Sequence, residues 1–325
     1  MPKPLFPRRA LLAGSAAALA APALAQSPWP NRPVRVIIPW PPGGAADLTG
    51  RIYCNALSQK TGQAFVVENR GGATGTIGEQ AMIQAPPDGY TLMHESTPIS
   101  VMAALMPDLR FSPVREFVPV FQTMIVPQLM LVHPSNPART PADLIAQMRQ
   151  ADGDFAAGSS GIGSLQHLAL ELFLRAANVK ANHIPYRGGA PAATDLLAGS
   201  IKLYFGNVNS TISYVRDGNL RALAHTSATP RIMALPELPA LSETLPGFSS
   251  AEWNGFFFRT STPPEIVQRL SALCNEIVVD PAIAAQLRSV DLTAEPNTPA
   301  QFAAFFRAES EKWQKFIGET GIRME

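Results

Sequence analysis

The chain has 325 residues, of which 46% are hydrophobic and 16% charged. This composition excludes a disordered chain and is sufficient for two lobes that each carry a hydrophobic core. The five histidines and two cysteines show no spacing typical of a zinc site, so we expect neither a metal nor another cofactor. Cys54 and Cys274 lie in predicted helices and could form a disulfide, although two buried thiols are favoured.

Residues 1–25 are typical of an export signal. Lys3, Arg8 and Arg9 precede an apolar run, and an A-x-A pattern that ends at Ala25 predicts cleavage before Gln26. The adjacent arginines are compatible with twin-arginine export and with ordinary secretion. The signal holds three of the 26 basic residues and no acidic one, so 23 basic residues face 25 acidic ones in the mature chain, which does not favour nucleic-acid binding. We expect a periplasmic protein without a membrane anchor, because the apolar run is too short to span a bilayer.

Residues 34–47 predict a short strand, a turn rich in proline and glycine, and the start of a helix. Gly43 and Gly44 allow the backbone to approach a ligand closely. The first amides of the helix, near Ala45, have no partner within the helix and lie at the positive end of its dipole, which suits a carboxylate or a phosphate. The same pattern is also typical of a plain connection between a strand and a helix, in which Asp47 is simply a cap.

Strands are then expected at residues 64–68 and 90–94, and the second leads into Glu95, Ser96 and Thr97. Strands continue to alternate with helices, which predicts an α/β fold. Two apolar runs, 118–125 and 128–133, are interpreted as the crossing from a first lobe to a second.

Residues 154–164 repeat the pattern of a strand that leads through glycine and serine into a helix. Ser159, Ser160 and Ser164 add hydroxyl groups, and His167 lies one turn into the helix, where it either faces the cleft or serves the core. If the two helix starts belong to two lobes that face one cleft, a small anion could be held from both sides.

The C-terminal part of the chain contains two amphipathic helices, each predicted to begin at a capping box, at Thr262 and at Thr298. We expect both to pack back on the first lobe. Lobe 1 would then comprise residues 26–124 and 227–325, and lobe 2 residues 125–226, with two connecting strands as a hinge.

A secreted serine hydrolase is the enzymatic alternative, with Ser159 or Ser160 as nucleophile, His167 or His225 as base and Asp195 as the orienting acid. The pattern G-x-S-x-G is not met there, because Ile162 stands where the last glycine belongs. We therefore expect no enzyme.

With these motifs the chain resembles the periplasmic solute-binding proteins of the tripartite tricarboxylate transporter group, the Bug family. The resemblance covers nearly the whole mature chain and rests on Pro-Trp-Pro-Pro-Gly-Gly-Ala-Ala-Asp at residues 39–47 and on residues 66–73, 87–92, 164–167, 185–191, 218–223 and 298–302. It implies a two-lobe α/β fold of the type II periplasmic binding protein kind, with the ligand cleft between the lobes. It also implies a monomer that delivers a small organic acid to the membrane permease subunits of the transporter.

The resemblance carries ligand-binding roles onto Gly43, Gly44, Ala45, Asp47, Ser96, Thr97, Ser159, Gly163, Ser164, His167 and Asn207. Two departures concern the ligand. Gly206 stands where the family often has an aspartate that could meet a ligand amine, and Glu95 stands where a small residue is usual. The predicted ligand is a dicarboxylate or an aromatic carboxylate, with an amino acid as the second choice. Presentation of a ligand to a membrane sensor kinase is the alternative to transport.

Overall fold

The computed structural model describes residues 29–322 apart from 44, 107, 187, 290, 291 and 293. The predicted signal, residues 1–25, and the predicted ligand residue Gly44 therefore lie outside the described residues. The strands are β1 Val34–Ile38, β2 Phe65–Asn69, β3 Thr91–Ser96, β4 Phe117–Val132, β5 Ala156–Ser159, β6 Asn182–Pro185, β7 Leu203–Asn207, β8 Arg221–His225 and β9 Ala251–Arg259. The α-helices are α1 Ala45–Thr61, α2 Thr76–Ile83, α3 Pro98–Leu105, α4 Pro113–Glu116, α5 Pro141–Ala151, α6 Leu165–Ala177, α7 Gly189–Leu197, α8 Val208–Arg216, α9 Pro264–Val278, α10 Pro281–Ser289 and α11 Pro299–Thr320; short 3₁₀ turns are η2 Ala73–Gly75 and η3 Leu241–Glu243.

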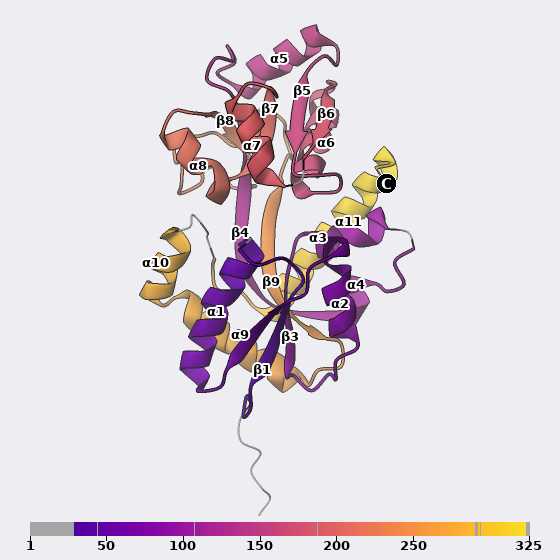
Figure 1. Cartoon of the computed structure of the whole chain (residues 1–325), viewed down its shortest axis with the longest axis vertical. Coiled ribbons are helices and arrows are strands. Elements are labelled where there is room, and N and C mark those ends of the chain that lie inside the picture. Colours follow the sequence, from indigo (N-terminus) through magenta and orange to yellow (C-terminus); the bar gives the residue numbers. More distant parts are fainter. Residues whose placement is uncertain are drawn as a thin grey trace, which may run out of the picture.

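The chain forms two lobes stacked along its long axis (Figure 1). In lobe 1, β1 pairs in parallel with β2 and β3, and β3 pairs with the antiparallel β9. In lobe 2, β5 pairs in parallel with β6 and β7, while β7 and β8 pair antiparallel with β4. The predicted two-lobe α/β architecture is confirmed.

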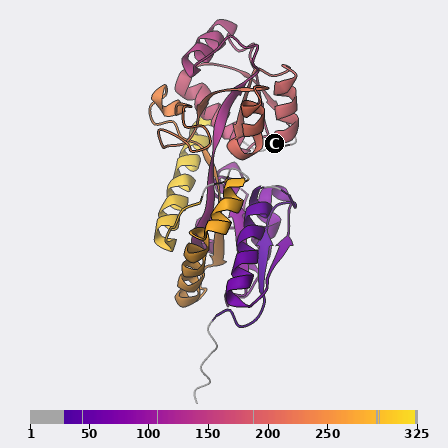
Figure 2. The same ribbon diagram turned by 90° about the vertical axis from the view of Figure 1, so that its left-hand side faces the viewer.

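The hinge between the lobes consists of β4 and β9 (Figure 2). The two predicted apolar runs form one 16-residue strand that continues through Pro127. Residues Phe117–Pro127 of β4 pair with β9, and Gln128–Leu131 pair with β7 in lobe 2. Because one strand belongs to both sheets, the lobes can rotate about it without separating.

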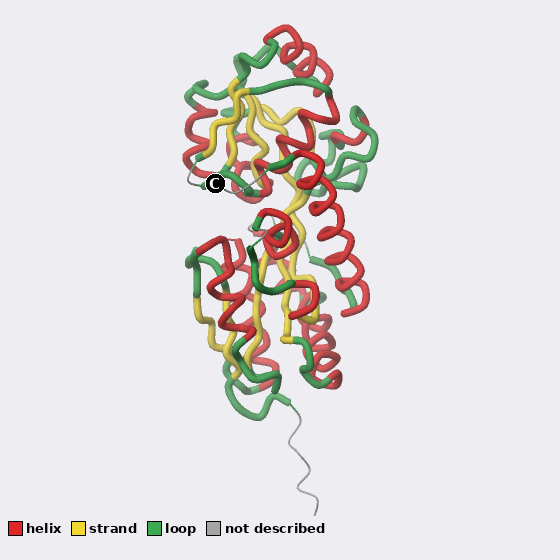
Figure 3. The backbone as a smooth tube through the Cα atoms, turned by 90° about the vertical axis from the view of Figure 1, so that its right-hand side faces the viewer, coloured by secondary structure: helices red, strands yellow, loops and turns green. Residues whose placement is uncertain are grey.

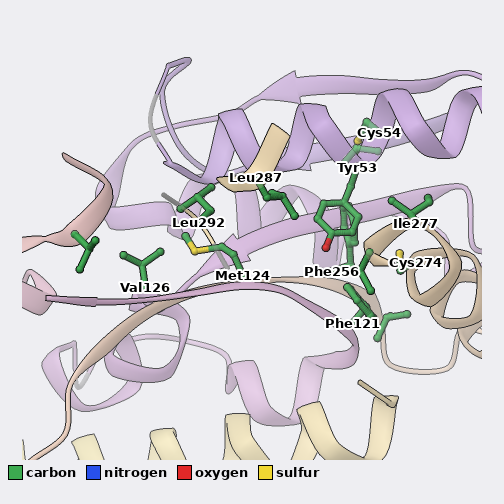
Figure 4. Close-up of a cluster of buried hydrophobic side chains, with 14 of the residues drawn as sticks. Tyr53, Cys54, Phe121, Met124, Val126, Phe256, Cys274, Ile277, Leu287 and Leu292 are labelled. Atoms are coloured by element: carbon green, nitrogen blue, oxygen red, sulfur yellow. The ribbon is translucent and has the colours of Figure 1, made fainter. Parts of the chain in front are cut away.

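The lobe 1 core surrounds Tyr53, Phe121 and Phe256, whose rings meet at centroid distances of 5.8 and 6.0 Å from Tyr53 (Figure 4). Cys54 and Cys274 are free, buried thiols in this core, and burial raises the pKa of Cys54 to about 12. An uncharged, buried thiol packs like a small apolar side chain. These thiols therefore contribute to packing and carry no reactive charge.

The segment 227–250 packs on lobe 2, although the sequence assigned it to lobe 1. Leu241 and Phe248 belong to the same buried cluster as Phe173 and Phe205. Ala240 also forms a bridge with His225 of β8. We therefore propose that lobe 2 extends to about residue 250, where β9 returns to lobe 1.

The helix α11 runs beside both lobes (Figure 3). It begins with the predicted capping box, in which the Thr298 side chain accepts a hydrogen bond from the Gln301 amide. Its first half packs on β9 through Phe302, and its end packs Trp313 with Leu165 and Leu168 of α6 in lobe 2. Its far end therefore meets the second lobe.

The predicted capping box at Thr262 is wrong. The cap position of α9 is Pro263, with no side-chain hydrogen bond, and the Thr262 amide, which a capping box would pair with the Glu265 carboxylate, donates to Arg259 O instead. Within the described range, no single helix is long and apolar enough to cross a bilayer; α9 and α10 satisfy the length and composition criteria only as a pair bent by 75°.

Candidate ligand-binding site

A cavity of about 510 Å³ lies between the two lobes. Five predicted ligand residues line it: Ala45, Ser96, Thr97, Gly163 and Ser164. The rest of the wall consists of Trp40, Pro41, Pro42, Ala46, Pro98, Ser160, Ile162, Leu165, Gln166, Gly188 and Glu252. Gly43, Asp47, Ser159, His167 and Asn207 are not part of the wall, and the following contacts show what they hold in place.

Asp47 fastens the loop that leads from β1 into α1. One carboxylate oxygen accepts from the Gly43 amide at 2.9 Å, and the other accepts from Asn69 Nδ2 and Arg51 Nε at 2.9 Å each. Asn69 Nδ2 also donates to Trp40 O at 3.0 Å. Burial opposes ionisation of Asp47, but the hydrogen bonds from Arg51, Gly43 and Asn69 outweigh it and hold its pKa below the usual value. The loop is therefore positioned before any ligand arrives.

The free amides at the cavity in lobe 1 are those of Ala45, a predicted ligand residue, and of Ala46. The Gly43 amide is occupied by Asp47. Ala45 and Ala46 line the cavity in the first turn of α1, and within the described part of the chain their amides have no hydrogen-bond acceptor. Since the helix dipole adds a partial positive charge there, these two amides suit an anion.

Asp47→Asn should weaken ligand binding about tenfold, or about 1.4 kcal/mol. An asparagine replaces one acceptor oxygen by a donor NH₂, which would then face the Gly43 amide or the Asn69 amide, both donors. Calorimetric titration with the acid that the protein binds most tightly would measure this loss, and Asp88→Asn, at an exposed carboxylate that pairs with Arg32, is the control. Equal affinities of Asp47→Asn and wild type would show that ligand binding does not depend on the hydrogen bonds between Asp47 and this loop.

Lobe 2 supplies the second helix start. Ser164 caps α6, and its hydroxyl accepts a hydrogen bond from the His167 amide at 3.2 Å. The Gly163 amide is occupied, since it donates to His167 Nδ1 at 3.1 Å. Leu165 and Gln166 line the cavity, and no acceptor for their amides exists among the described residues. The free amides of α6 therefore lie in the same cavity as those of α1.

The His167 side chain stabilises the start of α6, and its ring stacks on that of a second histidine. Its ring lies 4.2 Å from that of His183, at an interplanar angle of 8°. Burial, together with repulsion from His183, lowers the pKa of His167 to about 4, and burial lowers the pKa of His183. His183 Nε2 in turn meets the buried Ser159 hydroxyl at 2.7 Å. A neutral His167 can accept the Gly163 amide, whereas a doubly protonated ring cannot.

The free energy of unfolding should fall in mild acid because of His167. The unfolded histidine has its usual pKa near 6.5, so the unfolded chain binds a proton first as the pH falls, and stability present above pH 6.5 is lost towards about pH 4. A loss of about 2–3 kcal/mol is expected. Urea unfolding at pH 7.5 and 4.5 would measure it. His167→Gln should show a smaller difference, and an unchanged difference would refute the assignment.

A series of side-chain hydrogen bonds runs from lobe 2 to the hinge. Ser160 Oγ donates to Gln166 Oε1 at 2.5 Å, and Gln166 Nε2 donates to Asn207 Oδ1 at 3.0 Å. Asn207 Nδ2 donates to Glu252 of β9. Gln166, Glu252 and the indole of Trp40 were not foreseen as site residues. The one sequence signal for Glu252 was that it is the single acidic residue of the stretch Ala251–Arg259.

The structure shows the surroundings of Glu95 and Gly206, the two positions that depart from the family pattern. Glu95 is fully buried and faces neither the cleft nor solvent; its carboxyl accepts from the Trp40 indole at 3.0 Å. Burial, together with the nearby Glu79, raises its pKa well above the usual value, which favours the uncharged carboxyl. A side chain at Gly206 would meet Thr211, Tyr204 and Leu131 within 3.0 Å. A Cβ there would point into the interior of lobe 2.

The residues proposed for a serine hydrolase are not arranged as a catalytic triad. Ser159 pairs with His183 and not with either predicted base. Asp195 accepts from the Tyr186 hydroxyl at 2.6 Å, and His225 Nδ1 accepts from the Ser227 amide at 3.3 Å. No group of three or more metal-ligating side chains occurs within the described ranges.

A second cavity, of about 470 Å³, lies away from both helix starts. Its wall includes Met233, Phe305, Glu309 and Lys312. None of the predicted ligand residues lines it. Of the two cavities, the one between the lobes is the one that combines free helix amides from both sides.

Two α/β lobes with a hinge of two strands and a cavity between them define a solute-binding protein. The family model described as "Tripartite tricarboxylate transporter family receptor" matches residues 50–322. The chain belongs to this family. Protein BugT of Bordetella pertussis (strain Tohama I) is 33% identical over 95% of this chain and 95% of its own.

Solved structures extend the similarity. Rpa4515 of R. palustris with adipate is 31% identical, with a TM-score of 0.79, over 91% of this chain and all of that one. MatC of Rhodopseudomonas palustris with bound malate is 25% identical, with a TM-score of 0.75, over 89% of this chain and all of that one. The protein is a periplasmic solute-binding protein and not an enzyme.

Proposed function

We propose that this protein captures a small organic carboxylate between its lobes and presents it to the permease subunits of a tripartite tricarboxylate-type transporter. The observation that supports this most is the pair of helix starts, α1 and α6, that place free amides of Ala45, Ala46, Leu165 and Gln166 in one cavity. Amides at the positive ends of two helix dipoles can neutralise a carboxylate without a basic side chain.

The binding cycle involves no covalent chemistry. The ligand docks on the amides of one lobe, and rotation about β4 and β9 brings the other lobe over it. Closure excludes water, which strengthens each hydrogen bond to the carboxylate. The contact of Trp313 with Leu165 couples this rotation to the end of α11, so the closed form presents a different outer surface to the permease.

The ligand class has two candidates. Relatives that hold adipate and malate favour a dicarboxylate. The acidic side chain in the cavity wall, Glu252, favours an acid that also carries an amine. In both cases the carboxylate binds to the helix amides.

Titration of the mature chain, residues 26–325, would test the proposal. The probes are adipate, malate, succinate, benzoate, L-aspartate and L-glutamate, followed by calorimetry and by the thermal unfolding midpoint. At least one acid should raise the midpoint, because a ligand that binds the folded state stabilises it. If no acid of the panel binds or stabilises the protein, the proposed carboxylate capture is wrong.

A further inference from the structure

The carboxylate of Glu252 lies at the hinge end of the cavity. Glu252 is on β9, opposite Val126 of β4, and lines the cavity between the lobes. Its neighbour Ala251 lines the second cavity, as expected when successive residues of a strand point to opposite faces. The side of β9 that carries Glu252 therefore faces the ligand space.

The hydrogen bonds around Glu252 all run towards it. Ser160 donates to Gln166, Gln166 donates to Asn207, and Asn207 donates to one oxygen of Glu252, so this chain ends on an acceptor. Within the described residues the other oxygen has no hydrogen-bond partner, and no basic side chain compensates the charge. Burial raises the pKa of Glu252 because water is withdrawn from its charged form.

The cavity consequently has two unlike ends. The amides of α1 and α6 are donors that suit an anion. Glu252 is an acceptor that suits a cation or another donor. A ligand with a carboxylate and an ammonium group would satisfy both ends, and its ammonium would offset the burial of the Glu252 charge. A second carboxylate next to Glu252 would instead require a proton to be taken up.

We infer that Glu252 is the specificity-determining residue of this site and that it selects carboxylates that also carry an ammonium group. The inference rests on the proposed carboxylate capture and places the amine at the hinge. It does not depend on residue 206, where a side chain would point towards Thr211 and Leu131.

The test uses pairs of acids that differ only in the amine: L-aspartate and succinate, L-glutamate and glutarate, 4-aminobutanoate and butanoate. Calorimetry of residues 26–325 at pH 7.5 should show the amine-bearing member binding at least about tenfold more tightly in each pair that binds. Glu252→Gln keeps an oxygen for Asn207 and removes the charge, so it should reduce that ratio to about threefold or less. Glu265→Gln, an exposed acid on α9, is the matched control and should keep the wild-type ratio.

Two results would overturn the inference while leaving carboxylate capture in place. One is tighter binding of the amine-free acids, accompanied by proton uptake in the wild type but not in Glu252→Gln. Calorimetry in buffers of different ionisation enthalpy would measure this proton uptake. The other is an amine preference that survives Glu252→Gln in a variant with an unchanged thermal midpoint. If none of the acids binds, the proposed carboxylate capture is wrong, and the inference that rests on it is wrong as well.

Discussion

Ser164→Asp is expected to weaken binding of the acid that the wild type binds most tightly at least about 100-fold while leaving the fold intact. Aspartate is as good a helix cap as serine, so the bond to the His167 amide is kept. Ser164 lines the cavity, however, and the new carboxylate would lie beside the free amides of Leu165 and Gln166. Two like charges about 4 Å apart repel by about 4 kcal/mol near a protein surface, which exceeds the expected loss.

Ser164→Asn separates the two effects of this substitution. Asparagine caps a helix like aspartate but carries no charge, so Ser164→Asn should bind the same acid within about tenfold of the wild type. Calorimetric titration gives the affinities, and thermal unfolding shows whether both variants fold alike. Should Ser164→Asp bind that acid as tightly as Ser164→Asn does, α6 would have no role in holding the anion.

Trp253→Ala is expected to lower the free energy of unfolding by about 3–5 kcal/mol. Trp253 is fully buried on β9, and its ring meets those of Phe302, Phe305 and Phe306 at 5.6, 5.7 and 5.9 Å. The substitution would leave a cavity where α11 packs on the hinge strand.

Urea unfolding at pH 7.5 would measure the loss in Trp253→Ala. Val279→Ala is the control, because Val279 is 62% exposed and its truncation should change stability by less than about 0.5 kcal/mol. A loss below about 1 kcal/mol for Trp253→Ala would mean that α11 is not anchored through this cluster.

The sequence predicted the fold well where local signals and burial agree. The capping box at Thr298 marks the true start of α11, because cap, first-turn proline and apolar stripe all coincide. At Thr262 the same pattern misled, since a turn to Arg259 occupies the threonine amide. The proposed extension of lobe 2 to about residue 250 rests on long-range packing of Leu241 and Phe248, which no local pattern encodes.

For the proposed site, the sequence indicated the two helix starts and the amide of Ala45, but not that the Gly43 and Gly163 amides are occupied. Gly43 and Gly163 looked like the donors, yet Asp47 and His167, four residues later in each motif, occupy both amides. Glu252 was missed because it comes from a strand far from either motif in the sequence and reaches the cavity only through the hinge. Predicting such convergence requires the strand pairing, not the composition.

The most direct test of this account is a crystal structure of residues 26–325 grown with the acid of the panel that binds most tightly. We predict a carboxylate oxygen within about 3.2 Å of the amide nitrogen of Ala45 or Ala46, and the carboxylate in similar contact with Leu165 or Gln166. An acid bound instead in the cavity beside Met233 and Lys312, or one that touches neither helix start, would contradict it.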